Sequence, residues 1–306
     1  MAKRRLTKQQ SRRITEKTHH NAKEGLLISR FGSQADVEDK SGHLIRCKFR
    51  QNIGSIVAGD NVLWEPVDSQ HGVILRRKPR HSVLGRPDKQ NHIKAIAANI
   101  DQIFIVVAIK PQLTLSLLDS YLVATELLHI PAKIILNKSD LPHQDLLNNL
   151  ETYKALGYEV ITTNVYDSQG LKELSTHLHH KTSVFVGQSG VGKSSLIKGL
   201  IPHESIATGQ ISSQSELGKH TTSMSRLYHL HPSGDIIDSP GIREFGLWHM
   251  PAHDIAKGFI EFQPFIGHCK FRDCHHKKEP GCAIHQAVNK HQINRQRYQN
   301  YLKITC

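Results

Sequence analysis

The pattern of hydrophobic and polar positions divides the chain into four parts. Residues 1–24 are polar and basic with almost no apolar side chains, so we expect a disordered arm that orders only on meeting a partner. Residues 25–84 form short β-like stretches separated by Gly, Asp and Asn turns. They predict a small β-barrel, with the OB-fold favoured and an SH3-like barrel fitting nearly as well. The stretches are 25–30, 35–38, 43–48, 61–65 and 72–75.

Residues 85–247 form the third part, and the polar stretch at 81–91 is interpreted as a linker. Continuous apolar runs alternate with helical stripes, as the buried strands and covering helices of a parallel sheet require. We therefore predict a doubly wound α/β domain. Its strands are expected at 103–109, 133–136, 158–161, 183–186 and 235–237, and its helices at 117–128, 145–156, 171–178 and 193–200. The Ser/Gly-rich stretch 202–222 has no periodicity and is expected to be a mobile loop.

The last part, residues 248–306, combines clustered Cys and His with a polar, helical-looking tail at 286–304. It predicts a small, mostly helical zinc-binding domain. The fold class is therefore a multi-domain α/β protein. An N-terminal OB-fold barrel precedes a central doubly wound domain, and a C-terminal zinc-binding domain follows it.

The net charge of the chain indicates which class of partner it binds. The chain holds 40 Lys and Arg against 27 Asp and Glu, a net charge of +13, with 22 His besides. Such a surplus favours a polyanionic partner, above all nucleic acid, although a basic soluble enzyme has a similar composition. No run approaches the length of a membrane span, and the basic N-terminus lacks the apolar core of a secretory signal. We expect a cytoplasmic protein that does not enter a membrane.

The strongest chemical motif is a phosphate-binding P-loop, G-x-x-x-x-G-K-S, between a predicted strand and a predicted helix. Its glycines let backbone N–H groups converge on phosphate oxygens at a helix N-terminus. Lys193 is expected to face the β- and γ-phosphates, and the Ser194 hydroxyl to bind Mg²⁺. The predicted nucleotide-binding residues here are Gly187, Gln188, Ser189, Gly190, Val191, Gly192, Lys193, Ser194 and Ser195.

A second motif predicts which base is bound. Asn137, Lys138, Ser139 and Asp140 form the N-K-x-D pattern that follows a strand in GTPases. The Asp140 carboxylate can accept from both the ring N–H and the exocyclic amine of guanine, whereas adenine offers no matching pair of donors. Asn137 and Lys138 would brace the loop and cover the base. This motif argues against the alternative of a P-loop ATPase.

The order of these motifs is unusual, because N-K-x-D precedes the P-loop, whereas an ordinary GTPase has the P-loop first. The chain order therefore indicates a circular permutation, which is tolerated where the ends of a domain lie close together. Asp238 and Gly241 fit the D-x-x-G pattern of switch II, with Asp238 expected near Mg²⁺. The next residue, Ile242, cannot orient water as the Gln of many GTPases does, so intrinsic hydrolysis should be slow.

The end of the mobile stretch, Gly218-Lys219-His220-Thr221-Thr222, is interpreted as switch I. Thr221 or Thr222 is expected to complete the coordination of Mg²⁺, and the sequence alone does not choose between them. His220 is the predicted catalytic residue, since an imidazole that a partner positions can orient or deprotonate water.

Cys269, Cys274, His276 and Cys282 give the spacing C-x4-C-x-H-x5-C. Three thiolates and an imidazole suit one tetrahedral Zn²⁺, and this composition is typical of a structural site in a reducing compartment. His275 is the obvious competing ligand, with His285 a weaker one. The two remaining thiols, Cys47 and Cys306, are interpreted as non-ligands.

Together these motifs make the chain resemble the family of circularly permuted, ribosome small-subunit-dependent GTPases, over nearly its whole length. The resemblance implies a GTP hydrolase that binds GTP, GDP, Mg²⁺ and one Zn²⁺. It also implies that the small ribosomal subunit and its rRNA are partners, that subunit binding stimulates hydrolysis, and that the protein acts in late subunit maturation. His220 would then support hydrolysis in place of the absent Gln.

One departure from the family pattern lies in the loop that supports guanine. A Ser-Ala-type sequence is expected there, and this chain has Thr162, Thr163 and Asn164. The alternative to an enzyme is an RNA-binding assembly module with a vestigial nucleotide site. Intact Lys193, Ser194 and Asp238 argue against that alternative. A monomer is expected.

Overall fold

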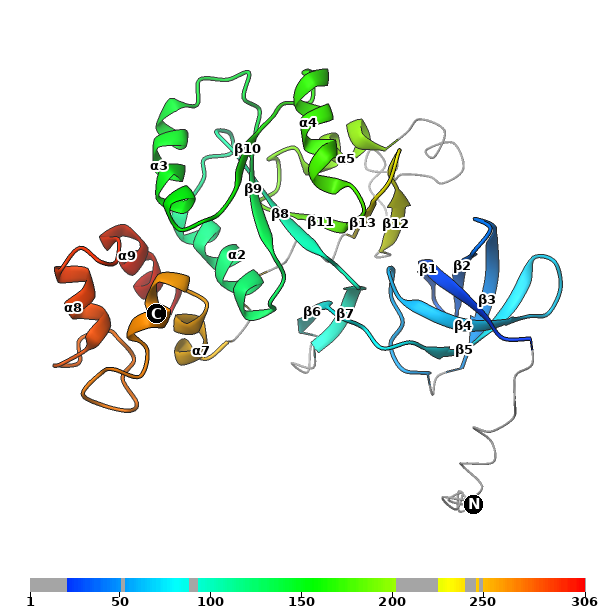
Figure 1. The fold of residues 1–306 in the computed structure, drawn as a ribbon, viewed down its shortest axis with the longest axis horizontal. Coiled ribbons are helices and arrows are strands. Elements are labelled where there is room, and N and C mark those ends of the chain that lie inside the picture. The colour runs from blue at the N-terminus through cyan, green and yellow to red at the C-terminus, as the bar shows by residue number, and fades with distance from the viewer. Residues whose placement is uncertain are drawn as a thin grey trace, which may run out of the picture.

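The computed structural model describes residues 21–50, 53–87, 93–201, 225–239, 246–247 and 250–305. A β-barrel and a small helical domain lie at opposite ends of a central α/β domain (Figure 1). The predicted arm lies outside the described residues, apart from its last four positions, 21–24. The described part already contains strand β1 from Lys23.

The N-terminal barrel closes on itself. Its strands are β1 (Lys23–Phe31), β2 (Gln34–Asp39), β3 (Leu44–Phe49), β4 (Asn61–Pro66) and β5 (His71–Arg77), in the order β1-β2-β3-β5-β4 with β4 returning to β1. Only the β3–β5 pair within this ring is parallel. Inward positions alternate with outward ones, and Leu27, Val37, Trp64 and Ile74 fill the interior. The five-stranded closure is OB-like, as predicted, and Trp64 is a core residue at 1% exposure.

The central sheet has the order β10-β9-β8-β11-β13-β12. Its first five strands run parallel, and β12 is antiparallel to β13. All seven residues of β8 are buried, as expected for the middle strand of a sheet covered on both faces. The strands are β8 (Gln102–Ala108), β9 (Ala132–Asn137), β10 (Val160–Thr162), β11 (Thr182–Val186), β12 (Arg226–His229) and β13 (Asp235–Asp238).

Four helices accompany these strands: α2 (Leu115–Leu127), α3 (Gln144–Ala155), α4 (Ser168–Leu178) and α5 (Lys193–Leu200). They fall where the apolar stripes predict them. The α2 and α3 side chains join the core cluster on one face of the sheet, and α4 and α5 join the cluster on the other. This is the doubly wound arrangement that the sequence predicts.

Three strands were not predicted. Strands β6 (Val83–Pro87) and β7 (Ile93–Ala98) pair as a two-stranded sheet within and just after the stretch interpreted as a linker. Strand β12 lies between β13 and barrel strand β1, where Ser29 pairs with Arg226. Because of this pairing, the barrel and the central sheet form one continuous 11-stranded sheet.

The C-terminal domain is helical, with α7 (Ala252–Lys257), η4 (Ile260–Phe265), α8 (Ala283–Asn289) and α9 (Arg295–Ile304). The tail expected as helical over 286–304 is therefore two helices, and the Asn294 side chain caps the second by accepting from the backbone N–H groups of Gln296 and Arg297. Its core includes Val123, a residue of α2. Within the described residues, none of the helices has the length and apolar character to cross a membrane.

Candidate nucleotide and metal sites

The P-loop follows β11 and leads into α5, as predicted. Gly187, Gly190 and Gly192 all have positive φ, which an L side chain rarely adopts. A Cβ atom on Gly187 would lie 2.3 Å from the carbonyl oxygen of Val106 on β8. The loop is therefore built from residues that alone permit this close backbone path.

The side chains of the P-loop differ in burial. Val191 is buried at 2% exposure and fixes the loop in the core. Ser194 and Ser195, in the first turn of α5, are exposed. Lys193 Nζ donates to the carbonyl oxygens of Gly187 and Gln188 at 2.6 and 2.8 Å. The ammonium thus lies over the loop that the sequence assigns to phosphate binding.

The N-K-x-D loop ends β9 and contacts the P-loop directly. Asn137 Nδ2 donates to the carbonyl oxygen of Val191 at 2.9 Å, and a Cβ atom on Gly192 would lie 2.3 Å from Asn137 Nδ2. Lys138, with φ of +60°, donates through Nζ to the carbonyl oxygens of Lys110 and Gly190 at 2.7 and 2.8 Å. Two motifs separated by some fifty residues therefore form one surface.

Two side chains of this surface have unused polar atoms. Asn137 Oδ1 and Thr163 Oγ1 are buried and find no hydrogen-bond partner among the described residues. Buried polar atoms are normally paired, and such exceptions occur at binding sites. Asp140 is exposed at the end of the same loop. The position of Asp140 is consistent with the predicted contact to a base.

The Thr162-Thr163-Asn164 loop supports the N-K-x-D loop through its backbone. The Thr163 N–H donates to the carbonyl oxygen of Leu136 at 2.9 Å, and its own carbonyl oxygen accepts from the Ser139 N–H at 3.2 Å. Thr162 is exposed and Asn164 half-buried. Thr163 therefore braces the N-K-x-D loop by main-chain bonds that most residue types could supply.

The switch residues are only partly described. Asp238 ends β13, which lies beside the P-loop strand β11, so the carboxylate stands at the same edge of the sheet as the P-loop. The predicted switch II residue Gly241 lies outside the described residues. So do the predicted switch I residues His220, Thr221 and Thr222.

The four predicted zinc ligands come together in the C-terminal domain. The ligand atoms of Cys269, Cys274, His276 and Cys282 all lie within 4.8 Å of one another. Cys269 Sγ is 3.9 Å from Cys282 Sγ and 3.5 Å from His276 Nδ1. Two sulfurs on one tetrahedral Zn²⁺ lie about 3.8 Å apart, given Zn–S bonds of about 2.3 Å. The cluster therefore fits a structural zinc ion.

The chemistry of this donor set also fits a metal. Burial raises the pKa of the Cys274 thiol to about 12 and lowers the pKa of the His276 imidazole. A neutral imidazole is a ready ligand, whereas buried thiolates need a bound cation to be favoured. The Ala283 N–H donates to Cys269 Sγ at 3.3 Å, which orients that sulfur as outer hydrogen bonds do in zinc sites.

The structure decides between the competing histidines. His276 is buried at 6% exposure with φ of +59°, whereas His275 is exposed. His285 Nε2 hydrogen-bonds Tyr298 Oη. The Glu279 carboxylate accepts hydrogen bonds from the backbone N–H groups of residues 275, 277 and 278. Burial opposes the ionisation of Glu279, but the backbone hydrogen bonds lower its pKa to about 2. This carboxylate shapes the turn that points His276 inward.

Cys47 lies in the barrel core, away from the cluster, and Cys306 lies outside the described residues.

The N-K-x-D loop that precedes the P-loop in the chain, the OB-like barrel and the zinc cluster together define a circularly permuted GTPase. Residues 77–248 match the family described as RsgA GTPase. The chain is 47% identical over 335 aligned positions to "Small ribosomal subunit biogenesis GTPase RsgA" of Proteus mirabilis, covering 99% of this chain and 95% of that protein. The protein of the same description from Hahella chejuensis is 46% identical, with 99% and 96% covered. The chain belongs to the RsgA GTPase family, and it is a GTP hydrolase.

Solved structures agree with this assignment. YjeQ from Thermotoga maritima is similar with a TM-score of 0.76 and 29% identity, covering 93% of this chain and 97% of that one. YloQ, described as a circularly permuted GTPase, gives a TM-score of 0.73 and 28% identity, with 95% and 96% covered. The permutation inferred from motif order is thereby confirmed.

Proposed function

We propose that this GTPase acts in the maturation of the small ribosomal subunit and that binding to the subunit stimulates its hydrolysis of GTP. The observation that carries the proposal is the joint surface made by the P-loop and the N-K-x-D loop, in a chain whose relatives are described as small-subunit biogenesis GTPases. Lys193, Ser194 and Asp238 are all present in the sequence, which argues against a vestigial nucleotide site.

We assign each residue of the nucleotide site a role in binding or hydrolysing GTP. The P-loop N–H groups and Lys193 hold the phosphates, Ser194 and Asp238 bind Mg²⁺, and Asp140 reads guanine. Mg²⁺ supplies the charge that draws electrons from the phosphate oxygens when it is bound with GTP. Ile242 stands where a water-orienting Gln is common, so His220 is assigned to orient water once the subunit has positioned it. Thr221 or Thr222 completes the metal site.

The proposal includes contact with rRNA, which two cation–aromatic pairs on the barrel support. Arg30 lies over the ring of Phe49 with its guanidinium carbon 5.0 Å from the ring centroid, and Arg46 lies over Phe31 at 4.9 Å. Paired cations and aromatic rings on an OB-like barrel suit the phosphates and bases of RNA. We further propose that the protein works as a monomer in the cytoplasm, where ribosomes mature.

The direct test is GTP turnover titrated with purified small or large ribosomal subunits. We expect small subunits to raise turnover by at least about tenfold, as a partner that completes a catalytic site does, and large subunits to have no such effect. Equal turnover with and without small subunits would contradict the proposal. A Lys193→Ala variant serves as the zero-activity control.

Base specificity is tested by Asp140→Asn. The amide keeps one acceptor oxygen but places an NH₂ donor where the second carboxylate oxygen would accept, so affinity for GDP relative to ADP should fall by about two orders of magnitude or more, as when a polar pairing is lost. Asp145→Asn, an exposed carboxylate in the first turn of α3, is the matched control. Undiminished discrimination in Asp140→Asn would refute the assignment of Asp140.

A further inference from the structure

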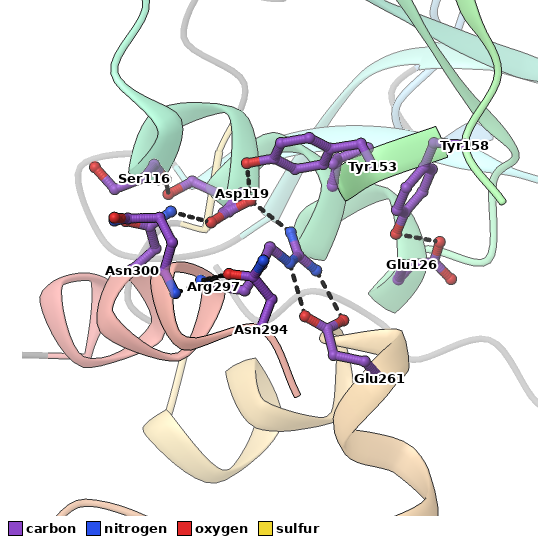
Figure 2. A network of polar contacts seen from close by, with 12 residues as sticks. Ser116, Asp119, Glu126, Tyr153, Tyr158, Glu261, Asn294, Arg297 and Asn300 are labelled. Atoms are coloured by element: carbon purple, nitrogen blue, oxygen red, sulfur yellow. Dashed lines mark hydrogen bonds and ion pairs between the residues drawn. The ribbon is translucent and has the colours of Figure 1, made fainter. Parts of the chain in front are cut away.

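A buried arginine joins the last helix of the chain to the central domain. Arg297, on α9, donates through Nη1 to Oδ1 of Asp119, on α2. Its Nε and Nη2 donate to the two carboxylate oxygens of Glu261, on η4, at 2.7 and 2.9 Å. Figure 2 shows the guanidinium held between the two carboxylates. One side chain thus connects the GTPase domain to two elements of the zinc-binding domain.

The remaining polar atoms around Arg297 are also satisfied. Asn300 Nδ2 donates to the second oxygen of Asp119, and Tyr153 Oη, on α3, donates to the first at 2.7 Å. The Arg297 side chain is 1% exposed and the Asp119 side chain is 0% exposed. A fully hydrogen-bonded ionic network at this depth holds one geometry, because any other leaves a charge unpaired away from water.

The charge states of this network are fixed by its members. Burial disfavours the charge on Arg297, but its hydrogen bonds to Glu261 and the charge of Asp119 raise the pKa of Arg297, so it stays charged. Burial raises the pKa of Asp119, and the nearby guanidinium opposes this rise. Burial raises the pKa of Tyr153, whose hydroxyl therefore remains a donor. The two carboxylates of Asp119 and Glu261 share one guanidinium, and the neutral donors of Tyr153 and Asn300 supply the other hydrogen bonds to Asp119.

Close packing surrounds the network. The Arg297 guanidinium carbon lies 4.8 Å from the centroid of the Phe259 ring and 5.3 Å from that of Tyr153. Beside them, a Cβ atom on Gly258 would lie 2.5 Å from Val123 Cγ1 and 2.8 Å from the Val123 carbonyl oxygen. The end of α7 therefore rests on the backbone of α2, and a side chain at position 258 would separate the two domains.

We propose that this arginine clamp, Arg297 with Asp119, Glu261 and Asn300, fixes the zinc-binding domain on α2, so that both domains turn as one rigid body whichever guanine nucleotide is bound. The chain enters the zinc-binding domain directly after the switch II motif, and that order alone would suggest that switch II steers the domain. The clamp contacts α2 and α3 instead, on the side of the base-reading loop.

A structural link extends the clamp toward that loop. The segment 112–116 and α9 residues Gln296, Asn300 and Lys303 line one pocket of about 400 Å³. The same segment follows Lys110, whose carbonyl oxygen accepts from Lys138 of the N-K-x-D loop. A partner that holds the zinc-binding domain therefore also fixes the helices flanking the base-reading loop. This inference rests on the proposed function in one respect only, namely that the bound nucleotide is a guanine nucleotide.

The first arm of the test uses the zinc-loaded protein with spectroscopic labels at Lys172 on α4 and Gln299 on α9, both exposed. The labels are attached through unnatural amino acids, because the zinc-site thiols would react with cysteine reagents. We expect one narrow distance distribution with the same mean when GDP or a non-hydrolysable GTP analogue is bound. A nucleotide-dependent shift of that mean would overturn the proposal, whether or not ribosomal subunits stimulate turnover.

The second arm removes the clamp. Arg297→Met should broaden the distance distribution or add a second population while the bound zinc remains one per chain. Arg297→Lys keeps the charge but not the two-pronged geometry and should restore only part of the order. Arg295→Gln, which removes an exposed charge from the same helix, should match the wild type. An unbroadened distribution in folded Arg297→Met would overturn the proposal, and if that variant does not fold, Asp119→Asn provides the same comparison.

Discussion

The two junctions of the central domain are built by different means. The zinc-binding domain is held by a buried ionic network whose hydrogen bonds have fixed directions. The barrel is held by strand pairing at Ser29 and Arg226, by small residues such as Ala58, which pairs with Ala97, and by exposed ion pairs of His229. The barrel junction therefore depends on a short strand pairing and on ion pairs that water screens, whereas the zinc junction depends on buried charges that are costly to separate.

The junctions also differ in what they touch. The barrel meets β12, which follows the predicted switch I, and β13, which leads into the predicted switch II: Gly59 lies against Ile237, and His229 bridges Glu38 of the barrel and Asp235 of β13. The zinc-binding domain meets α2 and α3, the helices on either side of the N-K-x-D loop in the sequence. We therefore expect any nucleotide-dependent shift of β12 and β13 to reach the barrel first, although the zinc-binding domain follows the predicted switch II in the sequence.

The largest expected effect comes from removing zinc. A structural zinc ion contributes about 10–16 kcal/mol of folding free energy in small zinc-binding peptides. We expect chelation to abolish amide exchange protection in residues 267–283, while the barrel and the central sheet keep theirs. Hydrogen exchange with mass spectrometry measures this. Equal loss of protection in the barrel would show that the two ends are not independent.

The clamp is next in size. Arg297→Met leaves Asp119 buried without its cation, which should lower the free energy of unfolding by about 3–5 kcal/mol. Denaturant titration followed by near-ultraviolet circular dichroism measures the loss. Arg295→Gln should stay within about 0.5 kcal/mol of the wild type, as surface substitutions do. Similar losses in the two variants would remove the special role of Arg297.

Gly59 tests the barrel junction. It has φ of +88°, and an added Cβ atom would lie 2.2 Å from the Ala98 carbonyl oxygen and 2.9 Å from Ile237 Cδ1. We expect Gly59→Ala to cost about 1–3 kcal/mol through overpacking and backbone strain. Gly54→Ala is the matched control, because Gly54 has φ of +81° but nothing within 4 Å of the added atom. The difference between the two isolates the clash, and equal losses would mean that only strain matters.

The smallest effect is a pH dependence at the same junction. The hydrogen bonds that the His229 ring donates to Asp235 and, against the opposing effect of burial, to Glu38 raise the pKa of His229 from 6.5 to about 9. Since the folded-state pKa is raised, the stabilisation is complete below about pH 6.5 and is lost as pH rises through about 9. For so exposed a pair it should amount to about 0.2–1 kcal/mol. Thermal unfolding of the wild type and His229→Gln across this range checks it, and a slope that persists in His229→Gln would exclude His229 as its source.

The sequence predicts the elements whose signal is local. The P-loop, its flanking strand and helix, and the N-K-x-D loop are each contained in a few residues with characteristic periodicity or spacing. The zinc set was likewise predicted, although only the left-handed backbone at His276 turns that residue, and not His275, inward. The OB-like closure followed from strand number and turn residues.

The missed features depend on distant partners. Strand β12 has four residues and becomes a strand because β1 and β13 flank it. The β6 strand contains Gly85 and ends at Pro87, residues that are unfavourable in isolated strands. The clamp was missed because the burial of Arg297 depends on Asp119, which precedes it by 178 positions. The available signal was a carboxylate within the apolar stripe predicted at 117–128.

The most direct test of the comparison measures both junctions under the same conditions, in two doubly labelled forms of the protein. Labels at Lys172 and Gln299 report the zinc-binding domain, and labels at Lys172 and Ser41, an exposed residue of the β2–β3 turn, report the barrel. On exchanging GDP for a non-hydrolysable GTP analogue, the Lys172–Gln299 distance should stay unchanged, whereas the Lys172–Ser41 distribution should shift or change its width. A moving zinc-binding domain beside a stationary barrel would contradict the account.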